Sequence, residues 1–470
     1  MKFGRFSWKF PFKFGYDAVE TSTRRQTPRS DVQSEDDHLI PSKRRKLVST
    51  VRDLRRNFSF AAWAIRKHLD YVSSFSFQSQ NMVFYGEKMK ELDNHIERLM
   101  KWWSLKENFD VRGMHSLHEF IRLSEACRVV DGDVFLYKLK AGMVQGIEGD
   151  LIANPTSGVL PRRYKAQDFQ HGVKRSVAGK PIAYAVNKRV GNHLEFHKVV
   201  SAKNIIQFAY WDRLDQIRGV SPLASAITTM QDAYESVVYA LGRAKISQLF
   251  GLVMKRASAE AVGEVSGGGT RTEGDDKSEY KVDFGKGPFI LDFDNPDDDA
   301  KFIDSNQPSS EFVQFFNATL ALALKALDIP FSFYDESFTN YSGARQALLL
   351  YEQSASEKRK AVKAVLDALT YWRIMLWIVD GVLKLPSGVK ISDLRWDWQP
   401  SGIPWVDPLK ETMADKEAVD GALTSRRRIL RRQGIDVNEV FDELEQEQKE
   451  IERRGIGSAA PTSVSQVIQH

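Results

Sequence analysis

Three long stretches of the chain repeat apolar side chains every three or four residues, which is the spacing of an α-helix. Residues 221–255 form the first and begin with a Ser-Pro pair, a capping residue followed by a proline suited to the first helical turn. The second, residues 310–327, ends before Pro330, and the third runs over residues 342–382. Helices of this length exceed the mean of about 11–12 residues, so the pattern predicts an elongated body.

The remaining chain divides into helical and strand-like parts. Apolar spacing is helical over residues 52–105 and 115–127, and two or three short helices are expected over residues 407–454. Residues 130–208 instead alternate apolar and polar positions in short runs punctuated by Gly and Pro, which is typical of β-strands. The pattern predicts an α+β protein that is mainly helical and has one β-rich region.

Charge is distributed unevenly along the chain. The net charge is +5, from 67 basic and 62 acidic residues, and residues 1–67 carry 16 basic against 7 acidic residues, a net of +9. A basic arm on a body of net −4 is not the footprint of a domain that reads DNA sequence, which usually carries a basic face. The run Lys43–Lys46 lies in this arm, and a nucleic-acid or phosphate contact is as good an interpretation as a solvated tail.

An acidic insertion separates the first two long helices. Residues 258–304 hold 13 acidic and 5 basic residues, a net of −8. They begin with a Gly/Ser-rich linker, and two short strands are expected at residues 280–285 and 288–293. The insertion is either solvated surface or a protruding acidic lobe that docks a partner.

The sequence contains no complete motif for catalysis or metal binding. Gly285-Lys286 lacks the other residues of a Walker A loop, and the sequence around Ser221 lacks the last glycine of a nucleophile elbow. The pairs His115/His118 and His193/His197 have no third ligand nearby, and Asp297–Asp299 read as a solvated turn. We therefore expect no enzyme, no metal and no cofactor.

Compartment and membrane association follow from composition. The single cysteine, Cys127, excludes an internal disulfide framework and fits a reducing compartment such as cytoplasm. The most apolar stretch, residues 374–379, is far shorter than the about 20 residues of a spanning helix. Cations interrupt the aromatic N-terminus, which is unlike a signal peptide. No membrane partner is expected.

Several segments, in their order and spacing over about residues 50–445, resemble one family, the lambda-type portal proteins of tailed bacteriophages. The most specific is Asp215–Leu223, which contains Gln216, Arg218, Gly219, Ser221 and Pro222. A second is Asn340–Arg345, with Tyr341, Ser342 and Arg345, although Gly343 stands where a serine is expected. The other similar segments are Arg56–Ile65, Asp131–Phe135, Asp407–Glu411, Gly421–Ser425 and Gln433–Asp436.

The resemblance implies a portal-type fold assembled as a ring, with these parts along the chain: a basic flexible arm at 1–50, a wing at 51–220 that is helical and then β-rich, a stem helix at 221–256, a small α/β clip at 257–308, a second stem helix at 309–327, a channel loop at 328–342, a long helix with the inner wing at 343–406, a helical crown at 407–455 and a disordered tail at 456–470. The clip would dock partners through Asp292, Asp294, Asp297, Asp298 and Asp299.

The implied function is a ring-shaped DNA channel at the capsid vertex, used for genome packaging, head–tail connection and DNA ejection. Its implied partners are other copies of the chain (probably twelve per ring), double-stranded DNA passing without sequence specificity, the packaging terminase, a neck or head-completion protein, and the capsid and scaffold proteins. The implied location is the virion, with host cytoplasm during assembly. A terminase-like or nuclease-like enzyme and a non-viral cytoplasmic scaffold are the alternatives.

The implied channel loop has a composition that suits a sliding polyanion. Residues 328–342 lie between Pro330, which ends one helix, and Ser342, which caps the next, and show no regular periodicity. They contain no Lys or Arg, and each neutralised phosphate would add affinity and friction. The side chains of this loop would face DNA, although its aromatic rings could equally pack between neighbouring subunits. These residues are Phe331, Phe333, Tyr334, Asp335, Glu336, Phe338, Asn340 and Tyr341.

Overall fold

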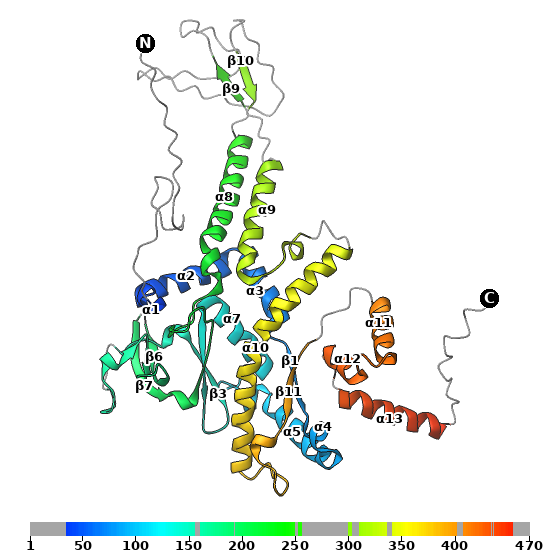
Figure 1. The fold of residues 1–470 in the computed structure, drawn as a ribbon. Helices are drawn as coiled ribbons and strands as arrows, with labels where there is room; N and C mark the ends of the chain where they lie inside the picture. The colour runs from blue at the N-terminus through cyan, green and yellow to red at the C-terminus, as the bar shows by residue number, and fades with distance from the viewer. Residues whose placement is uncertain are drawn as a thin grey trace, which may run out of the picture. The chain divides into compact units, whose positions relative to one another are not determined.

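A computed structural model describes residues 34–155, 160–191, 193–249, 252–255, 299–302, 310–335, 341–401, 408–433, 435 and 437–454 (Figure 1). The chain separates into two compact units, the first made of residues 1–224 and 345–470 and the second of residues 225–344. In the described part of the chain, no helix is both long and apolar enough to cross a membrane.

The first unit begins with helices that pack on one another. They are α1 (Glu35–His38), α2 (Pro41–Asn57), α3 (Ser59–Val72), α4 (Asn81–Tyr85), α5 (Lys90–Trp103), α6 (Lys106–Phe109) and α7 (Leu117–Asp131). A capping box opens α7, in which Ser116 and Glu119 exchange hydrogen bonds with each other's backbone amides. Residues 41–50, predicted to belong to a flexible arm, are instead the first turns of α2, because Pro41 starts the helix and Val48 and Val51 are buried.

The helical interpretation of residues 52–105 is wrong at one place. Phe75–Ser79 form a strand, β1, which pairs antiparallel with β11 (Trp396–Pro400). Trp398 of β11 is buried, packs edge-on against Phe77 with ring centroids 5.1 Å apart, and donates from Nε1 to Thr370 Oγ1 at 3.0 Å. This contact joins two segments more than 300 residues apart in sequence, which local periodicity does not reveal.

The β-rich region predicted at residues 130–208 is confirmed as two antiparallel sheets. One has the order β3–β2–β8, and the other has the order β4–β5–β6–β7. The strands are β2 (Asp133–Lys138), β3 (Val144–Glu148), β4 (Phe169–Gln170), β5 (Val173–Arg175), β6 (Pro181–Val190), β7 (His193–Ser201) and β8 (Ile205–Ala209). Their inner faces share a buried cluster that includes Phe135, Ile152, Tyr184 and Ile217.

The second unit is built on a helical hairpin. A 3₁₀ turn at Pro222–Ala226 leads into α8 (Ile227–Leu249), which lies beside α9 (Ser310–Leu324) and runs in the opposite direction (Figure 1). The helix predicted to reach residue 256 stops earlier, since Leu252–Lys255 form β9 and pair antiparallel with β10 (Asp299–Phe302). The strands expected at residues 280–285 and 288–293 lie outside the described residues.

Long and short helices complete the chain. The predicted third long helix is confirmed as α10 (Tyr341–Val379), whose 39 residues span about 58 Å at 1.5 Å per residue. It buries Leu366, Leu369 and Ile374 in the first unit. The short C-terminal helices are also confirmed, as α11 (Pro408–Asp420), α12 (Arg426–Arg432) and α13 (Val437–Arg454).

Candidate functional site

The predicted channel loop contains more regular structure than its sequence suggests. Phe331–Phe333 form a 3₁₀ turn after Pro330, and the Asp335 amide donates to the Phe331 carbonyl at 3.0 Å. The rings of Phe331 and Tyr334 lie 5.6 Å apart within this turn. The expectation of an irregular loop is therefore wrong for residues 331–335, since proline fixes a backbone angle that suits a helical first turn.

The rest of the predicted loop is only partly described. Glu336, Phe338 and Asn340 lie outside the described residues, and Tyr341 is already the first residue of α10, one position before the predicted cap. In residues 328–335 the only charged side chains are the acids Asp328 and Asp335. The described part of the loop can therefore present aromatic rings and carboxylates to a ligand and offers no cation to a phosphate.

The motif residues at 216–222 meet the Asp131–Phe135 segment in the interior of the first unit. Arg218 is buried and donates from Nε and Nη2 to the two carboxylate oxygens of Asp133, at 2.6 and 2.9 Å. Its Nη1 atom donates to the carbonyl oxygens of Ile152 and His171, at 2.6 and 2.9 Å. One guanidinium thus joins both sheets and the 216–222 segment.

A second arginine completes this centre from α2. Arg44 Nη2 lies 2.9 Å from Asp133 Oδ1, and Arg44 Nη1 donates to the Gly219 carbonyl at 2.6 Å. Burial opposes the charge of Asp133, but Arg218 and Arg44 together hold the pKa of this carboxyl below its usual value. Burial also lowers the pKa of Arg44 to about 10, which leaves the side chain charged near neutral pH. The centre is an ionised, buried Arg–Asp–Arg cluster.

Two glycines allow the same segments to touch. A Cβ atom on Gly132 would lie 2.4 Å from the Gly219 carbonyl oxygen, and one on Gly219 would lie 2.1 Å from the Gly132 carbonyl oxygen. Gly132 also has a φ of +92°, a conformation that favours glycine. The close approach of these two backbone segments therefore requires a glycine in each of the two motifs.

The remaining residues of the 216–222 motif are also structural. Gln216 Oε1 accepts the Asp212 amide at 2.9 Å, and Gln216 Nε2 donates to the Arg218 carbonyl at 2.7 Å. Ser221 Oγ donates to the Val129 carbonyl at 2.6 Å and accepts the Leu223 amide at 3.2 Å, while Pro222 starts the 3₁₀ turn that follows. These residues hold the chain where it leaves the sheets.

The other predicted site residues lie in helix α10, in strand β10 or outside the described residues. Tyr341 and Ser342 open α10, and Arg345 lies half-buried one turn further on. Asp299 is the first residue of β10 and pairs in register with Lys255 of β9. The other predicted docking acids, Asp292, Asp294, Asp297 and Asp298, lie outside the described residues.

The histidine pairs occupy different settings. His115 precedes α7 and His118 lies in its first turn, so the two do not share one helical face, whereas His193 and His197 both lie on β7. Where side chains are described, no three His, Cys, Asp or Glu residues group in a way that could hold a metal ion.

Sequence reasoning missed a second buried ionic cluster. Glu125 of α7 accepts from Arg128 Nε at 2.7 Å and contacts His68 Nε2 of α3 at 2.7 Å, with all three side chains buried. The Arg128 guanidinium also lies 3.8 Å from the Tyr210 ring centroid, over its face. The available signal was the spacing of Glu125 and Arg128 on the apolar face of α7, next to Ile121 and Val129.

Comparisons with known proteins agree on one family. A sequence model described as phage portal protein, lambda family, matches residues 22–359. The probable portal protein of Halomonas phage phiHAP-1 (isolate -/Gulf of Mexico/-/2001) is 22% identical over 457 residues, which cover 89% of this chain and 83% of that protein.

Solved structures that are similar come from gene transfer agent particles. A chain from the virion of the native particle has a TM-score of 0.48 and 13% identity, and a chain from the neck of the native particle computed with C12 symmetry has 0.46 and 13%. Each match covers 82% of this chain and 93% of the other. The family match, which spans well over half of the sequence, is decisive: the chain belongs to the lambda family of phage portal proteins.

Proposed function

We propose that this portal protein assembles as a closed ring of identical subunits, twelve in number, and that double-stranded DNA passes through its centre. The observation that carries the ring is the apolar surface of the α8–α9 hairpin. Tyr239 is 72% exposed on α8, and Phe315 and Leu322 are 65% and 69% exposed on α9. Large exposed apolar groups on neighbouring helices are typical of protein interfaces.

A ring follows from how such a surface can be covered. Exposed apolar groups occur on both helices of the hairpin, and Val238 and Leu241 add to those on α8. A subunit that uses different surfaces toward its two neighbours makes heterologous contacts, which close into a ring when the rotation permits. We assign α8 and α9 to the stem, the β9–β10 pair and the insertion to the clip, and α11–α13 to the crown.

The same proposal gives the channel and its partners. Residues 328–342 face the axis, where their acids and aromatic rings let the duplex slide without ion pairs. The ring has no catalytic role of its own, so the packaging terminase supplies the energy for DNA movement. It sits at the capsid vertex with the capsid, scaffold and neck proteins, after assembly in the host cytoplasm.

Electron microscopy and native mass measurement of the purified protein test the ring. We expect particles with a central hole and one mass corresponding to twelve chains. Replacing exposed apolar groups, as in Tyr239→Glu with Leu322→Glu, is expected to shift the protein toward smaller species. Gln231→Glu, an exposed polar position on α8, is the matched control and is expected to leave rings intact. A wild-type chain that stays monomeric or dimeric at every concentration and salt would refute the proposal.

The acidic insertion is proposed to be the surface that docks the terminase and later the neck protein. Its net charge of −8 would attract a basic patch and raise the association rate. We expect Asp297→Asn, Asp298→Asn and Asp299→Asn together to slow terminase binding at low salt while rings still form. Association rates measured by surface plasmon resonance would be unchanged if the acids play no part.

A further inference from the structure

Helix α2 is strongly basic and is fixed in one orientation. Its 17 residues include seven cations and a single acid, Asp53. Two of the cations are used inside the fold: Arg44 pairs with the buried Asp133, and Arg52 donates to both oxygens of Asp131 at 2.8 and 2.6 Å. Because these two arginines and the buried Val48 lie against the rest of the first unit, the opposite side of α2 must face outward.

The remaining five cations of α2 are exposed. They are Lys43, Arg45, Lys46, Arg55 and Arg56, and the exposed Ser42 and Ser49 lie among them. Serines 42 and 49 and cations 45, 46 and 56 recur at helical spacing, and Lys43 lies at the edge of the same side, so these six residues form one stripe; Arg55 lies outside it, on the side of Val48. From Ser42 to Arg56 this stripe extends about 21 Å at 1.5 Å per residue.

Nearby acids neutralise little of this charge. Asp53 interacts within the helix, with Asn57 Nδ2 at 2.7 Å and Arg56 Nη2 at 3.9 Å. In the described part of the chain no carboxylate makes an ion pair with Lys43, Arg45, Lys46 or Arg55. The neighbouring helix α1 contributes two acids at its own first turn, the half-buried Glu35 and the exposed Asp37. The stripe therefore keeps most of its positive charge.

We propose that this basic stripe of α2 binds the phosphate backbone of double-stranded DNA without sequence specificity, as a contact separate from the predicted channel loop. The inference rests on the proposed function in one respect, that duplex DNA is the polyanion this protein handles. Duplex DNA presents one charge per about 1.7 Å of its axis, so a stripe of about 21 Å faces many phosphates at once. Serine hydroxyls and Lys or Arg side chains are the groups that usually contact phosphate oxygens.

The composition of the stripe also argues against an acidic protein as its ligand. It offers no exposed Asn or Gln side chain between its cations to pair with adenine edges, so its hydrogen-bond donors are cations and serine hydroxyls. It also lacks exposed aromatic and large apolar groups between residues 42 and 56, which form the core of most protein interfaces. Charge and hydroxyl groups alone are sufficient for backbone binding.

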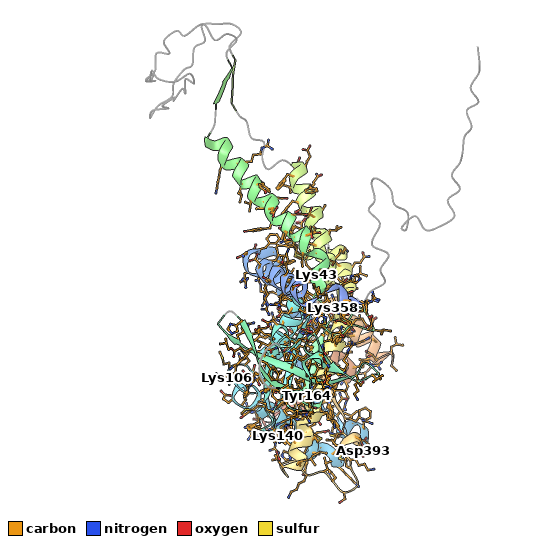
Figure 2. The ribbon with its side chains drawn as sticks, turned by 90° about the vertical axis from the view of Figure 1, so that its left-hand side faces the viewer. Lys43, Lys106, Lys140, Tyr164, Lys358 and Asp393 are labelled. Atoms are coloured by element: carbon orange, nitrogen blue, oxygen red, sulfur yellow. The ribbon has the colours of Figure 1, made fainter. Side chains whose placement is uncertain are left out.

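The first test compares two variants of equal charge change in the assembled ring. Lys43→Glu with Lys46→Glu alters the stripe, and Lys106→Glu with Lys140→Glu alters exposed lysines on other elements; Figure 2 labels Lys43, Lys106 and Lys140. Binding of a short fluorescent duplex is followed by anisotropy as salt is raised. The stripe variant is expected to bind more weakly for AT-rich and GC-rich duplexes alike, with the salt slope reduced by about 2, about 1 for each phosphate contact. The control variant is expected to match wild type.

The second test uses the wild-type ring and so does not depend on variant folding. Acetylation of lysines by a water-soluble reagent is measured by mass spectrometry with and without duplex DNA. Lys43 and Lys46 are expected to be protected by DNA, and Lys106 and Lys140 are not. Three results would each overturn the inference. They are equal protection of both lysine pairs, equal loss of DNA binding in both variants, and displacement of the bound duplex by a polyglutamate peptide as effectively as by unlabelled duplex DNA. None of these results would bear on ring formation, which electron microscopy checks separately.

Discussion

At the scale of single residues, the Arg44–Asp133–Arg218 centre is the most sensitive point of the first unit. Replacing Asp133 with Asn leaves two guanidinium groups buried without their shared anion, and breaking a buried pair in this way typically lowers stability by about 3–5 kcal/mol. We expect a markedly lower thermal midpoint and poor soluble yield. Asp53→Asn, at an exposed acid of α2, is the control and is expected to change the free energy of unfolding by less than about 0.5 kcal/mol.

The same centre predicts a pH dependence of stability. Because the pKa of Asp133 is lower in the folded protein than in the unfolded chain, its contribution is complete above the unfolded value of about 3.9. That contribution is lost as pH falls through the folded pKa. Wild-type protein should therefore lose stability in acid more steeply than Asp133→Asn. Parallel acid melts of the two proteins, recorded by circular dichroism, would contradict this assignment.

Cys127 offers a second test at this scale. Burial, with smaller contributions from Asp131 and Glu148, raises the pKa of its thiol to about 12. Compared with an ordinary thiol, the thiolate fraction near pH 8 falls by about a thousandfold, and the thiolate is the reactive form. Alkylation by iodoacetamide is expected to be very slow in the native protein and fast after unfolding in urea. Rapid native labelling would show that the thiol is accessible.

At the scale of elements, sequence periodicity predicted those elements whose stabilising contacts are close in the chain. Helices α8, α9 and α10 repeat apolar residues over many turns, whereas Ser221 and Pro222, predicted to start the first of them, open the 3₁₀ turn Pro222–Ala226 and α8 begins only at Ile227. Strand β1 was missed because its partner β11 follows more than 300 residues later, and β9 was read as helix because its partner β10 lies at the far end of the acidic insertion. Short strands take their stability from pairing, which sequence spacing does not encode.

The motifs were recognised, but their physical role was not. The resemblance singled out Arg218, Gly219 and the Asp131–Phe135 segment as separate signatures, and the structure joins them in one buried contact with Arg44. Arg44 itself was read only as part of a basic run that either contacts nucleic acid or phosphate or is solvated, since a charged residue in such a run gives no sign that one member points inward. Burial of a charge depends on a partner from a distant segment.

The pairing of β1 with β11 predicts a cooperative response. Trp398→Ala removes a fully buried indole and is expected to lower stability by about 3–5 kcal/mol. Trp398→Phe keeps a ring against Phe77 but loses the hydrogen bond to Thr370 and part of the buried volume, so a smaller loss of about 1–2 kcal/mol is expected. Hydrogen exchange should show the amides of both strands losing protection together in the alanine variant. Loss confined to β11 would mean that β1 is stable without it.

At the scale of the whole molecule, the chain combines a unit held by buried ion pairs with a unit whose helices expose apolar groups. In the first unit, the buried carboxylates of Asp133 and Glu125 pair with cations of the same subunit. The second exposes Tyr239, Phe315 and Leu322 and is proposed to gain its partners from neighbouring copies. We therefore expect substitutions in the buried clusters to impair folding and substitutions on the hairpin surface to impair ring assembly.

The proposed channel loop gives the prediction that depends most on the ring. In the proposed ring, symmetry would bring every copy of Asp335 and Glu336 to one axis, so a weak contact with the duplex would be repeated around it. Asp335→Lys with Glu336→Lys would replace repulsive carboxylates by ammonium groups, each of which gains affinity by releasing counterions from DNA. We expect normal rings and capsids, slow DNA packaging in a terminase-driven assay, and partial recovery at higher salt, because the added contacts are screened. Asp335→Asn with Glu336→Gln removes the charge without adding attraction and should package at close to the wild-type rate. Packaging by the lysine variant at the wild-type rate would show that these residues do not line the channel.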